Sequence, residues 1–268
     1  MFSSRNLSFT RPSVTRPLAE VEAELHQWLE SGYGDYLLQQ QRLCLRSAPT
    51  LPGYHLLQLG MTPAPGLLAD FPHLHRFSLS SGRTREGGAA VADFAELPLP
   101  CDCIDTVLLH HALDFSAEPH AVLREAVRVL MPGGHIVIFG FNPLGPWGLS
   151  KPFGQFLSTQ AVWRYNSLLR GRIADWLTVL HCAPIWSAWG GYQPPGSTPW
   201  WREKTPGLDR WGQRLLPWTG AFYALIARKT VARPIVDKGL RWSGVPVPSL
   251  ALQRMAAVKD GKKVRRSA

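Results

Sequence analysis

Hydrophobic and polar residues alternate with two different periods in the middle of this chain. Residues 106–110 (TVLLH) and 135–141 (HIVIFGF) are short apolar runs rich in β-branched residues, a pattern typical of strands buried on both faces of a parallel sheet. Between them, apolar residues recur at helical spacing up to Leu130, and the Pro-Gly-Gly sequence at 132–134 is expected to end that helix. Strand, helix and strand in this order predict a right-handed crossover unit.

Further elements are predicted on both sides of this unit. Residues 18–46 are expected to form two helices with a break at 31–34, and the proline- and glycine-containing stretch at 143–154 to form a loop. The other regular elements predicted are a first strand ending near Gln58, a second ending at Ser78, a helix over 167–182, a sixth strand at 184–189 and a last strand at 221–228.

Candidate binding residues lie where the strands of such a sheet end. In open sheets of parallel strands, ligands bind outside the carboxyl ends of the strands. We therefore expect ligand contacts from Asp93, Phe94, His110, His111 and the loop after Asn142.

The order of these features resembles one enzyme superfamily, the class I S-adenosylmethionine-dependent methyltransferases, and within it the type 11 group. The similarity is carried by an acid that closes a strand, a Leu-Pro pair, an Asp that opens the next strand, a His-His pair and the sequence LREAVRVLMPGG, which are here Asp93, Leu97-Pro98, Asp105, His110-His111 and 123–134. It extends over about residues 32–229. The resemblance implies an α/β fold with a Rossmann-like, doubly wound sheet of seven strands, mostly parallel with an antiparallel last strand.

The resemblance also implies S-adenosylmethionine as the cofactor. In the family an acid-x-Gly-x-Gly-x-Gly loop follows the first strand, because glycine lets the backbone approach the ligand; here Gln58 replaces the acid and Gly60 is the one glycine left. The family's second strand ends in an acid that holds the ribose, where this chain has Ser78. The cofactor-binding residues implied are Gln58, Gly60, Met61, Thr62, Ser78, Leu79, Asp93, Phe94 and His110.

Composition fits a globular enzyme domain. A chain of 268 residues with 45% hydrophobic residues can bury the core of one α/β domain. No apolar run reaches the roughly 18 residues that span a bilayer, and the first residues lack a signal-peptide apolar region, so a cytoplasmic protein is expected. The four cysteines show no disulfide framework, and Cys101 and Cys103 lack the spacing of zinc ligands, so no metal is expected.

Composition also divides the chain into segments. Residues 1–16 are expected to be disordered and 17–229 to form the methyltransferase-like domain. The tail at 230–268 is expected to be flexible; its basic end supplies half of the net charge of +10 and could bind nucleic acid or an acidic membrane surface, or only keep the protein soluble. Within the domain, residues 190–220 form an insertion predicted to be a lid over the strand ends or a flap over the core, with Trp200, Trp201, Trp211 and Trp218.

Candidate catalytic chemistry is confined to the His-His pair. Methyl transfer needs the donor and acceptor held in line and, for a protonated acceptor, a base. Imidazole titrates near neutral pH, so His111 or His110 is the candidate base, although His110 could instead only line the cofactor pocket. Tyr33 and Tyr36 are candidate lid residues or ordinary packing aromatics.

Two classes of function remain open from the sequence. The first is an active methyltransferase for a small-molecule or lipid-like acceptor. The second is a catalytically inactive methyltransferase-fold protein that binds or scaffolds a partner, with nucleic acid at its basic tail as one candidate. A nicotinamide-dependent oxidoreductase is disfavoured, because no G-x-G-x-x-G sequence follows the first strand.

Overall fold

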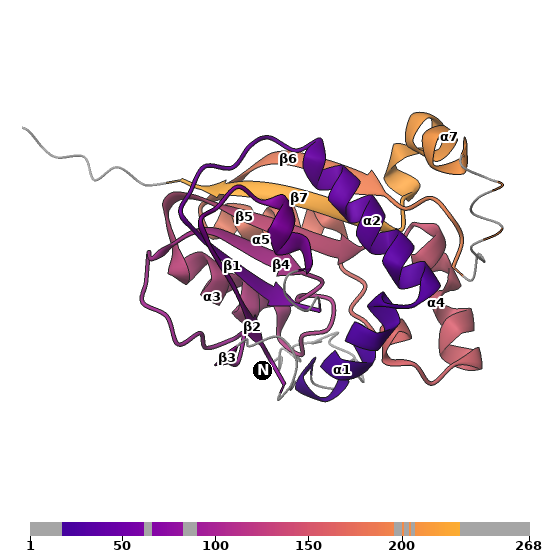
Figure 1. Cartoon of the computed structure of the whole chain (residues 1–268), viewed down its shortest axis with the longest axis horizontal. Helices are drawn as coiled ribbons and strands as arrows, with labels where there is room; N and C mark the ends of the chain where they lie inside the picture. The colour runs from indigo at the N-terminus through magenta and orange to yellow at the C-terminus, as the bar shows by residue number, and fades with distance from the viewer. Residues whose placement is uncertain are drawn as a thin grey trace, which may run out of the picture. The chain divides into compact units, whose positions relative to one another are not determined.

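Seven strands form a single sheet in the order β3-β2-β1-β4-β5-β7-β6 (Figure 1). The computed structural model describes residues 18–61, 66–82, 90–195, 200, 204 and 207–230, so the predictions for residues 1–16 and for the tail after Thr230 lie outside the described residues. The strands are β1 (His55–Gly60), β2 (His75–Ser80), β3 (Ala90–Val91), β4 (Ile104–His110), β5 (Leu130–Phe141), β6 (Cys182–Gly190) and β7 (Phe222–Lys229).

Strand direction confirms the predicted sheet type. Strands β1 to β5 pair in parallel with their neighbours, whereas β7 runs antiparallel between β5 and β6. The centre of the sheet is apolar on both faces: the side chains of β4 from Val107 to His110 and of β5 from Ile136 to Phe141 are buried. This is why both segments appear in the sequence as continuous apolar runs rather than alternating ones.

Helices cover both faces of the sheet. Figure 1 shows α2 crossing one face, with α3 and α5 on the other and with α4 and α7 at one end of the molecule. The helices, including short 3-10 turns labelled η, are α1 (Leu18–Leu29), α2 (Gly32–Arg46), η1 (Gly66–Asp70), α3 (Pro119–Val129), α4 (Pro146–Leu157), η2 (Ala161–Trp163), α5 (Arg170–Val179), α7 (Gly207–Leu215) and η3 (Pro217–Thr219).

The two N-terminal helices confirm the prediction of a helical pair with a break, which falls at residues 30–31. Helix α2 buries Leu37 fully, and it packs against η1 and β6. In the described part of the connection from β1 to β2, the helical segment is the five-residue turn η1 rather than a full crossover helix. Helix α2 therefore supplies much of the apolar cover that crossover helices give to a doubly wound sheet.

The loop predicted for residues 143–154 is wrong, because the chain forms helix α4 there. Pro146 occupies the first turn, where its missing N–H is no loss, and Gly145 precedes it in an extended conformation. Trp147 and Gly154 are buried on one side of the helix, and a Cβ at Gly154 would lie 2.3 Å from the ring of Trp163. The proline and glycine content of this segment disfavours a helix. The packing of Trp147 and Gly154 against the rest of the protein offsets that cost.

Two predicted strand boundaries are also corrected. Strand β2 ends at Ser80 rather than Ser78, so Ser78 lies two residues inside the strand. Strand β5 begins at Leu130 and includes the Pro-Gly-Gly sequence at 132–134, and helix α3 ends at Val129. The register between β4 and β5 shifts between Ile104 and Thr106, which accommodates these residues as an irregular start of the strand.

We predict that Gly60→Ala strongly destabilises the protein. Gly60 has a φ of +125°, and a Cβ at this position would lie 2.0 Å from the carbonyl oxygen of His110 in the neighbouring strand. Both the conformation and the contact penalise any side chain, so we expect the free energy of unfolding to fall by at least about 2 kcal/mol. Urea denaturation followed by tryptophan fluorescence measures this change.

The matched control for that substitution is Gly171→Ala in helix α5. A Cβ at Gly171 meets no atom within 4 Å, so the substitution should be neutral or stabilising by up to about 1 kcal/mol. Equal stability of the two variants would contradict the conclusion that the end of β1 requires glycine.

Candidate functional site

The loop after β1 is held against the end of β4. Gly60 pairs with His110 across the two strands, and the backbone N–H of Met61 donates to the carbonyl of His110 at 3.0 Å. Gln58 is buried in β1, next to Ser78 of β2, and Met61 is fully buried. Thr62, also predicted to bind cofactor, lies outside the described residues. The backbone of Gly60 and Met61 is thus fixed at the carboxyl end of the sheet.

An acid does lie at the end of β2, but it comes from helix α1. The carboxylate of Glu22 accepts hydrogen bonds from the Ser80 hydroxyl at 2.7 Å, the Ser81 hydroxyl at 3.0 Å and the Gly82 N–H at 2.7 Å. Glu22 is almost completely buried, whereas Ser78 is half-buried and Leu79 is buried. A carboxylate from helix α1 therefore lies at the end of β2, a strand that in this chain has no acid of its own.

Glu22 was not among the predicted site residues, although the sequence carries a signal for it. Helix α1 buries Leu25 and Leu29, which follow Glu22 by three and seven residues. The three residues therefore lie on the same face of the helix. A charged residue on the apolar face of an amphipathic helix must find hydrogen-bond partners inside the protein. Only the tertiary structure identifies those partners as the end of β2.

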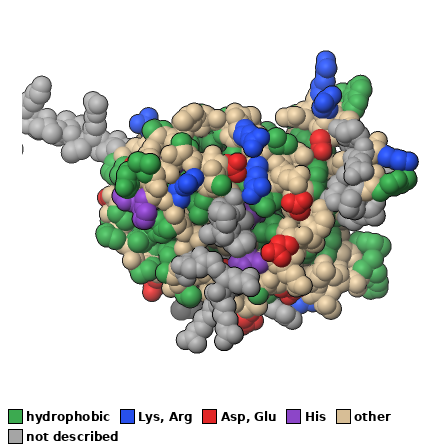
Figure 2. Space-filling view, viewed as in Figure 1, with side chains coloured by type: hydrophobic (Ala, Val, Ile, Leu, Met, Phe, Trp, Pro, Cys, Tyr) green, Lys and Arg blue, Asp and Glu red, His purple; other side chains and the backbone are tan. Residues whose placement is uncertain are grey.

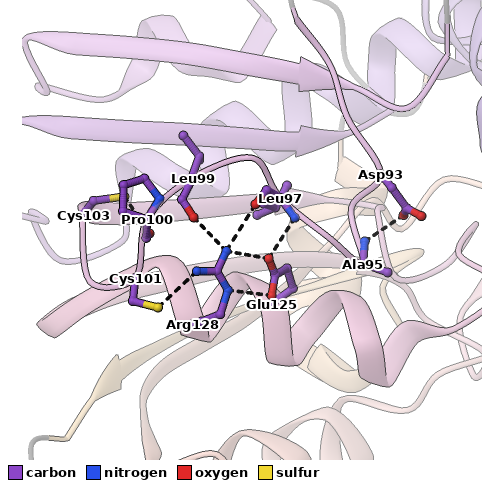
Figure 3. Close-up of polar contacts among 9 residues, drawn as sticks. All are labelled: Asp93, Ala95, Leu97, Leu99, Pro100, Cys101, Cys103, Glu125 and Arg128. Atoms are coloured by element: carbon purple, nitrogen blue, oxygen red, sulfur yellow. Dashed lines mark hydrogen bonds and ion pairs between the residues drawn. The ribbon is translucent and has the colours of Figure 1, made fainter.

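A pocket of about 610 Å³ opens next to this carboxylate. Asp93 and Phe94 lie in its wall with Ser81, and α1 contributes Ala19. Asp93 is exposed, and its Oδ1 accepts the N–H of Ala95 at 2.9 Å (Figure 3). The other carboxylate oxygen has no role in that turn. Two of the predicted cofactor residues, Asp93 and Phe94, therefore line one pocket.

The loop that carries Asp93 and Phe94 leads into a segment pinned to helix α3 by one ion pair. The guanidinium of Arg128 donates to Glu125 and to the carbonyls of Leu97 and Leu99, and Glu125 in turn accepts the N–H of Leu97 (Figure 3). Hydrogen bonding to Arg128 lowers the pKa of Glu125. Arg128 also contacts Cys101, and no group of three or more His, Cys, Asp or Glu that could hold a metal ion occurs in the described part of the chain.

The two histidines after β4 belong to a buried hydrogen-bond chain. Gln41 of α2 donates from Nε2 to His111 Nε2 and accepts at Oε1 from His110 Nε2, both at 2.8 Å. Since His111 Nε2 accepts, its Nδ1 carries the proton and donates to Asp114 Oδ2 at 2.8 Å. Asp114 Oδ2 also accepts the N–H of Phe141 at 2.9 Å. All four side chains are fully buried.

Burial determines the protonation states of the ionisable side chains in this hydrogen-bond chain. It lowers the pKa of His111 to about 3 and that of His110 well below its ordinary value, and it raises the pKa of Asp114. Both imidazoles are therefore neutral near pH 7. His111 could accept a proton from a bound acceptor only if Gln41 moved away from its Nε2, so its predicted catalytic role stays a prediction.

A second pocket, of about 510 Å³, has aromatic walls. Trp28, Tyr33, Trp147 and Trp163 line it, with Glu24 at its side. The rings of Tyr33, Trp147 and Trp163 form a stack, with centroid distances of 5.2 and 4.2 Å between successive rings. The walls come from helices α1, α2 and α4 and from η2.

The lid or flap predicted for residues 190–220 stays a prediction, and the described tryptophans of this insertion do not lie in the core. Trp200, Trp211 and Trp218 are exposed, and Trp201 lies outside the described residues. The insertion is attached by its polar groups instead. Asp209 accepts the Tyr36 hydroxyl at 2.6 Å and the N–H of Tyr192. The Tyr33 hydroxyl donates to the carbonyl of Gln193, so both tyrosines hold the insertion.

Comparison with known proteins agrees with this architecture. Residues 75–138 match the model of a methyltransferase domain family. Over 134 residues the chain is 35% identical to the uncharacterized protein YafS of Escherichia coli (strain K12), a match that covers 48% of this chain and 52% of that relative. The chain thus matches about half the length of this curated relative.

Solved structures share the fold at low identity. An S-adenosylmethionine-dependent methyltransferase from Thermotoga maritima superposes with a TM-score of 0.60 at 12% identity, covering 80% of this chain and 98% of that one. Another from Archaeoglobus fulgidus gives a TM-score of 0.53 at 14% identity, covering 76% and 98%. These structures show that the chain has the fold of class I methyltransferases, and its residues 75–138 are similar to the methyltransferase domain family.

We predict that the unfolding free energy of this protein falls as the pH drops from about 6.5 to 4. His110 and His111 are neutral in the folded protein but bind protons near pH 6.5 when unfolded, so the unfolded state binds more protons in this range. Asp114 acts in the opposite direction, because burial raises its pKa. Each histidine should contribute a loss of up to about 1.4 kcal/mol per pH unit, measured by urea unfolding at several pH values.

His111→Asn isolates the contribution of one imidazole. His111 has a φ of +55°, which asparagine tolerates, and an amide NH2 can still donate to Asp114. The pH slope should fall by about 1.4 kcal/mol per unit in this variant. His75→Asn, at an exposed position of β2, should leave the slope unchanged. An unaltered slope in His111→Asn would contradict the buried neutral imidazole.

Proposed function

We propose that this chain is an S-adenosylmethionine-dependent methyltransferase that acts on a small-molecule or lipid-like acceptor. The observation that carries this proposal is the pocket lined by the two family-matched residues, Asp93 and Phe94, together with Ser81, whose hydroxyl donates to the buried carboxylate of Glu22. The cofactor supplies an electrophilic methyl group on a sulfonium centre. The protein has to bind it, orient it and exclude water.

The residues present fit the adenosine part of this cofactor. The pocket is large enough for a nucleoside and has an aromatic ring, Phe94, beside an exposed carboxylate, Asp93. Asp93 Oδ2 can accept from an exocyclic amino group while Oδ1 keeps its bond to Ala95. Gly60 leaves open the space that a side chain would fill at the end of β1, where the family places the methionine part.

Glu22 is the residue that we assign to the ribose hydroxyls. A carboxylate binds a diol through charge-assisted hydrogen bonds, whereas the residues at the end of β2, Ser80 and Ser81, offer hydroxyl groups. Glu22 is already bonded to these serines, so it lies within reach of a ligand at their position. Helix α1 would then be both a structural cover and a part of the cofactor site.

The aromatic pocket is the candidate acceptor site. Its walls include Trp147 and Trp163 from the segment after β5, together with Trp28 and Tyr33 from the N-terminal helices. Flat, rigid apolar walls suit an acceptor with an apolar or aromatic body. Glu24, with one oxygen bonded to the N–H of Ala161 at 2.6 Å, is a carboxylate at this pocket.

Our first functional prediction concerns Asp93→Asn. The amide oxygen can keep the bond to the N–H of Ala95, whereas the group facing the pocket changes from a charged acceptor to a donor. We expect the affinity for S-adenosylmethionine to fall by roughly ten-fold or more, with little change in stability. Isothermal titration calorimetry measures the affinity.

Asp175→Asn, on the exposed side of α5, is the control for that substitution and should bind like the unsubstituted protein. If the unsubstituted protein bound neither S-adenosylmethionine nor S-adenosylhomocysteine at millimolar ligand, the methyltransferase proposal would be wrong. The inactive binding-protein alternative would then be favoured.

A second prediction tests helix α1. Glu22→Gln retains the shape and one hydrogen-bond acceptor but removes the charge, so affinity for S-adenosylmethionine should fall by roughly ten-fold or more. Glu24→Gln, two residues along the same helix, contacts Ala161 and should leave this affinity unchanged. Equal affinities for both variants would remove Glu22 from the cofactor site and leave the assignment of Asp93 untouched.

A further inference from the structure

Helix α4 exposes a continuous apolar face. Leu149, Phe153, Phe156 and Leu157 recur at i, i+4, i+7 and i+8, and the two phenylalanines are 66% and 87% exposed. At 3.6 residues per turn these four side chains fall within an arc of about 100°. The opposite side of the helix is buried in the protein through Trp147 and Gly154. Helix α4 therefore packs into the protein with one side and exposes a second apolar side that has no part in the core.

Helix α7 and η3 carry further exposed apolar side chains at the same end of the molecule. Trp211, Leu215, Leu216 and Trp218 are all exposed. The start of α4 is tied to this segment, because the amide of Asn142 donates to the carbonyls of Trp218 at 2.7 Å and Gly220 at 2.8 Å. We call the combined surface the α4–α7 face; its apolar members are Leu144, Leu149, Phe153, Phe156, Leu157, Trp211, Leu215, Leu216 and Trp218.

The α4–α7 face lies at one end of the molecule. In Figure 1 both helices are at the right-hand end, and Figure 2 shows hydrophobic side chains gathered along that edge. An exposed apolar surface of this extent usually marks a binding surface, because monomeric soluble proteins rarely expose large contiguous apolar patches. The face therefore calls for an occupant.

The charges around this face are basic. Arg210 and Arg214 are exposed on α7, and Lys204 lies 4.1 Å over the ring of Trp200. The one acid of helix α7, Asp209, is turned inward to Tyr36 and Tyr192. Tryptophan, phenylalanine and leucine flanked by arginine and lysine are the residues of a surface that lies in the headgroup region of a bilayer.

We propose that the α4–α7 face binds the surface of an anionic lipid bilayer. The apolar side chains would enter the boundary between headgroups and acyl chains, and Arg210, Arg214 and Lys204 would face the anionic headgroups. In the described ranges no helix is long and apolar enough to cross a membrane, so the contact is made by a face of the domain.

Docking through this face would place the aromatic pocket next to the lipid bilayer. Trp147 lines that pocket from the inner side of α4, while Phe153 and Phe156 point outward from the same helix. A lipid-borne acceptor could pass from the bilayer to the pocket without crossing bulk water. That extension rests on the proposed methyltransferase function, whereas bilayer binding itself does not.

The experiment is co-sedimentation of the full chain with vesicles of phosphatidylcholine and phosphatidylglycerol, compared with phosphatidylcholine alone. Phe153→Ser with Phe156→Ser should weaken vesicle binding by at least about 100-fold, because two exposed aromatic side chains that would be buried in the bilayer are lost. Arg210→Gln with Arg214→Gln should weaken binding to the anionic vesicles by about 30-fold, since each charge near such a surface contributes about 1 kcal/mol.

Matched controls lie away from this face. Leu74→Ser removes a leucine that is 80% exposed at the amino end of β2, and Arg124→Gln removes an exposed charge from α3; both should bind like the unsubstituted chain. All variants keep the basic tail, so any binding through the tail is common to them. Circular dichroism and thermal unfolding establish that each variant is folded.

Three results would overturn the proposal. One is binding of the double phenylalanine variant equal to that of the Leu74→Ser control. Another is no vesicle binding by the unsubstituted chain. The third is a dimer that the phenylalanine substitutions convert to a monomer without any vesicle binding, which would make a second copy of the chain the occupant. Calorimetric titration with S-adenosylmethionine without vesicles tests the methyltransferase proposal separately.

Discussion

The buried hydrogen-bond chain through Gln41 is the constraint on which the centre of this structure depends. It links helix α2 to both histidines after β4, and Asp114 carries it on to the backbone at the end of β5. In a low-dielectric interior such bonds are strong, and a polar group left without a partner is costly. These hydrogen bonds therefore fix α2 over the sheet in one position. It also explains why two histidines can lie in the core of the domain.

The N-terminal helices take over work that strands and crossover helices do elsewhere in this fold. Helix α2 covers the sheet where the β1–β2 connection is only a short turn, and α1 brings Glu22 to the end of β2. This chain keeps one glycine of the family's loop after β1 and has no acid on β2, and the N-terminal helices cover this part of the domain. Residues that precede the sheet in sequence close the side of the domain on which the cofactor is proposed to bind.

Fold alone leaves the chemistry open, and the residues at the strand ends have to decide it. In the present chain, one pocket carries Asp93 and Phe94 and a separate pocket carries stacked aromatic rings. A donor site and an acceptor site are what methyl transfer requires.

The sequence by itself determined the centre of the sheet and singled out Asp93 and Phe94, which line a pocket. Continuous apolar runs and the helix between them fixed β4, α3 and β5, because burial on both faces leaves no other pattern, and Asp93 and Phe94 follow directly from their place after a strand. Only the tertiary structure decided the role of Glu22, the sealing of His111 by Gln41 and the formation of α4. Each of these depends on contacts between segments far apart in the chain, which local periodicity does not encode.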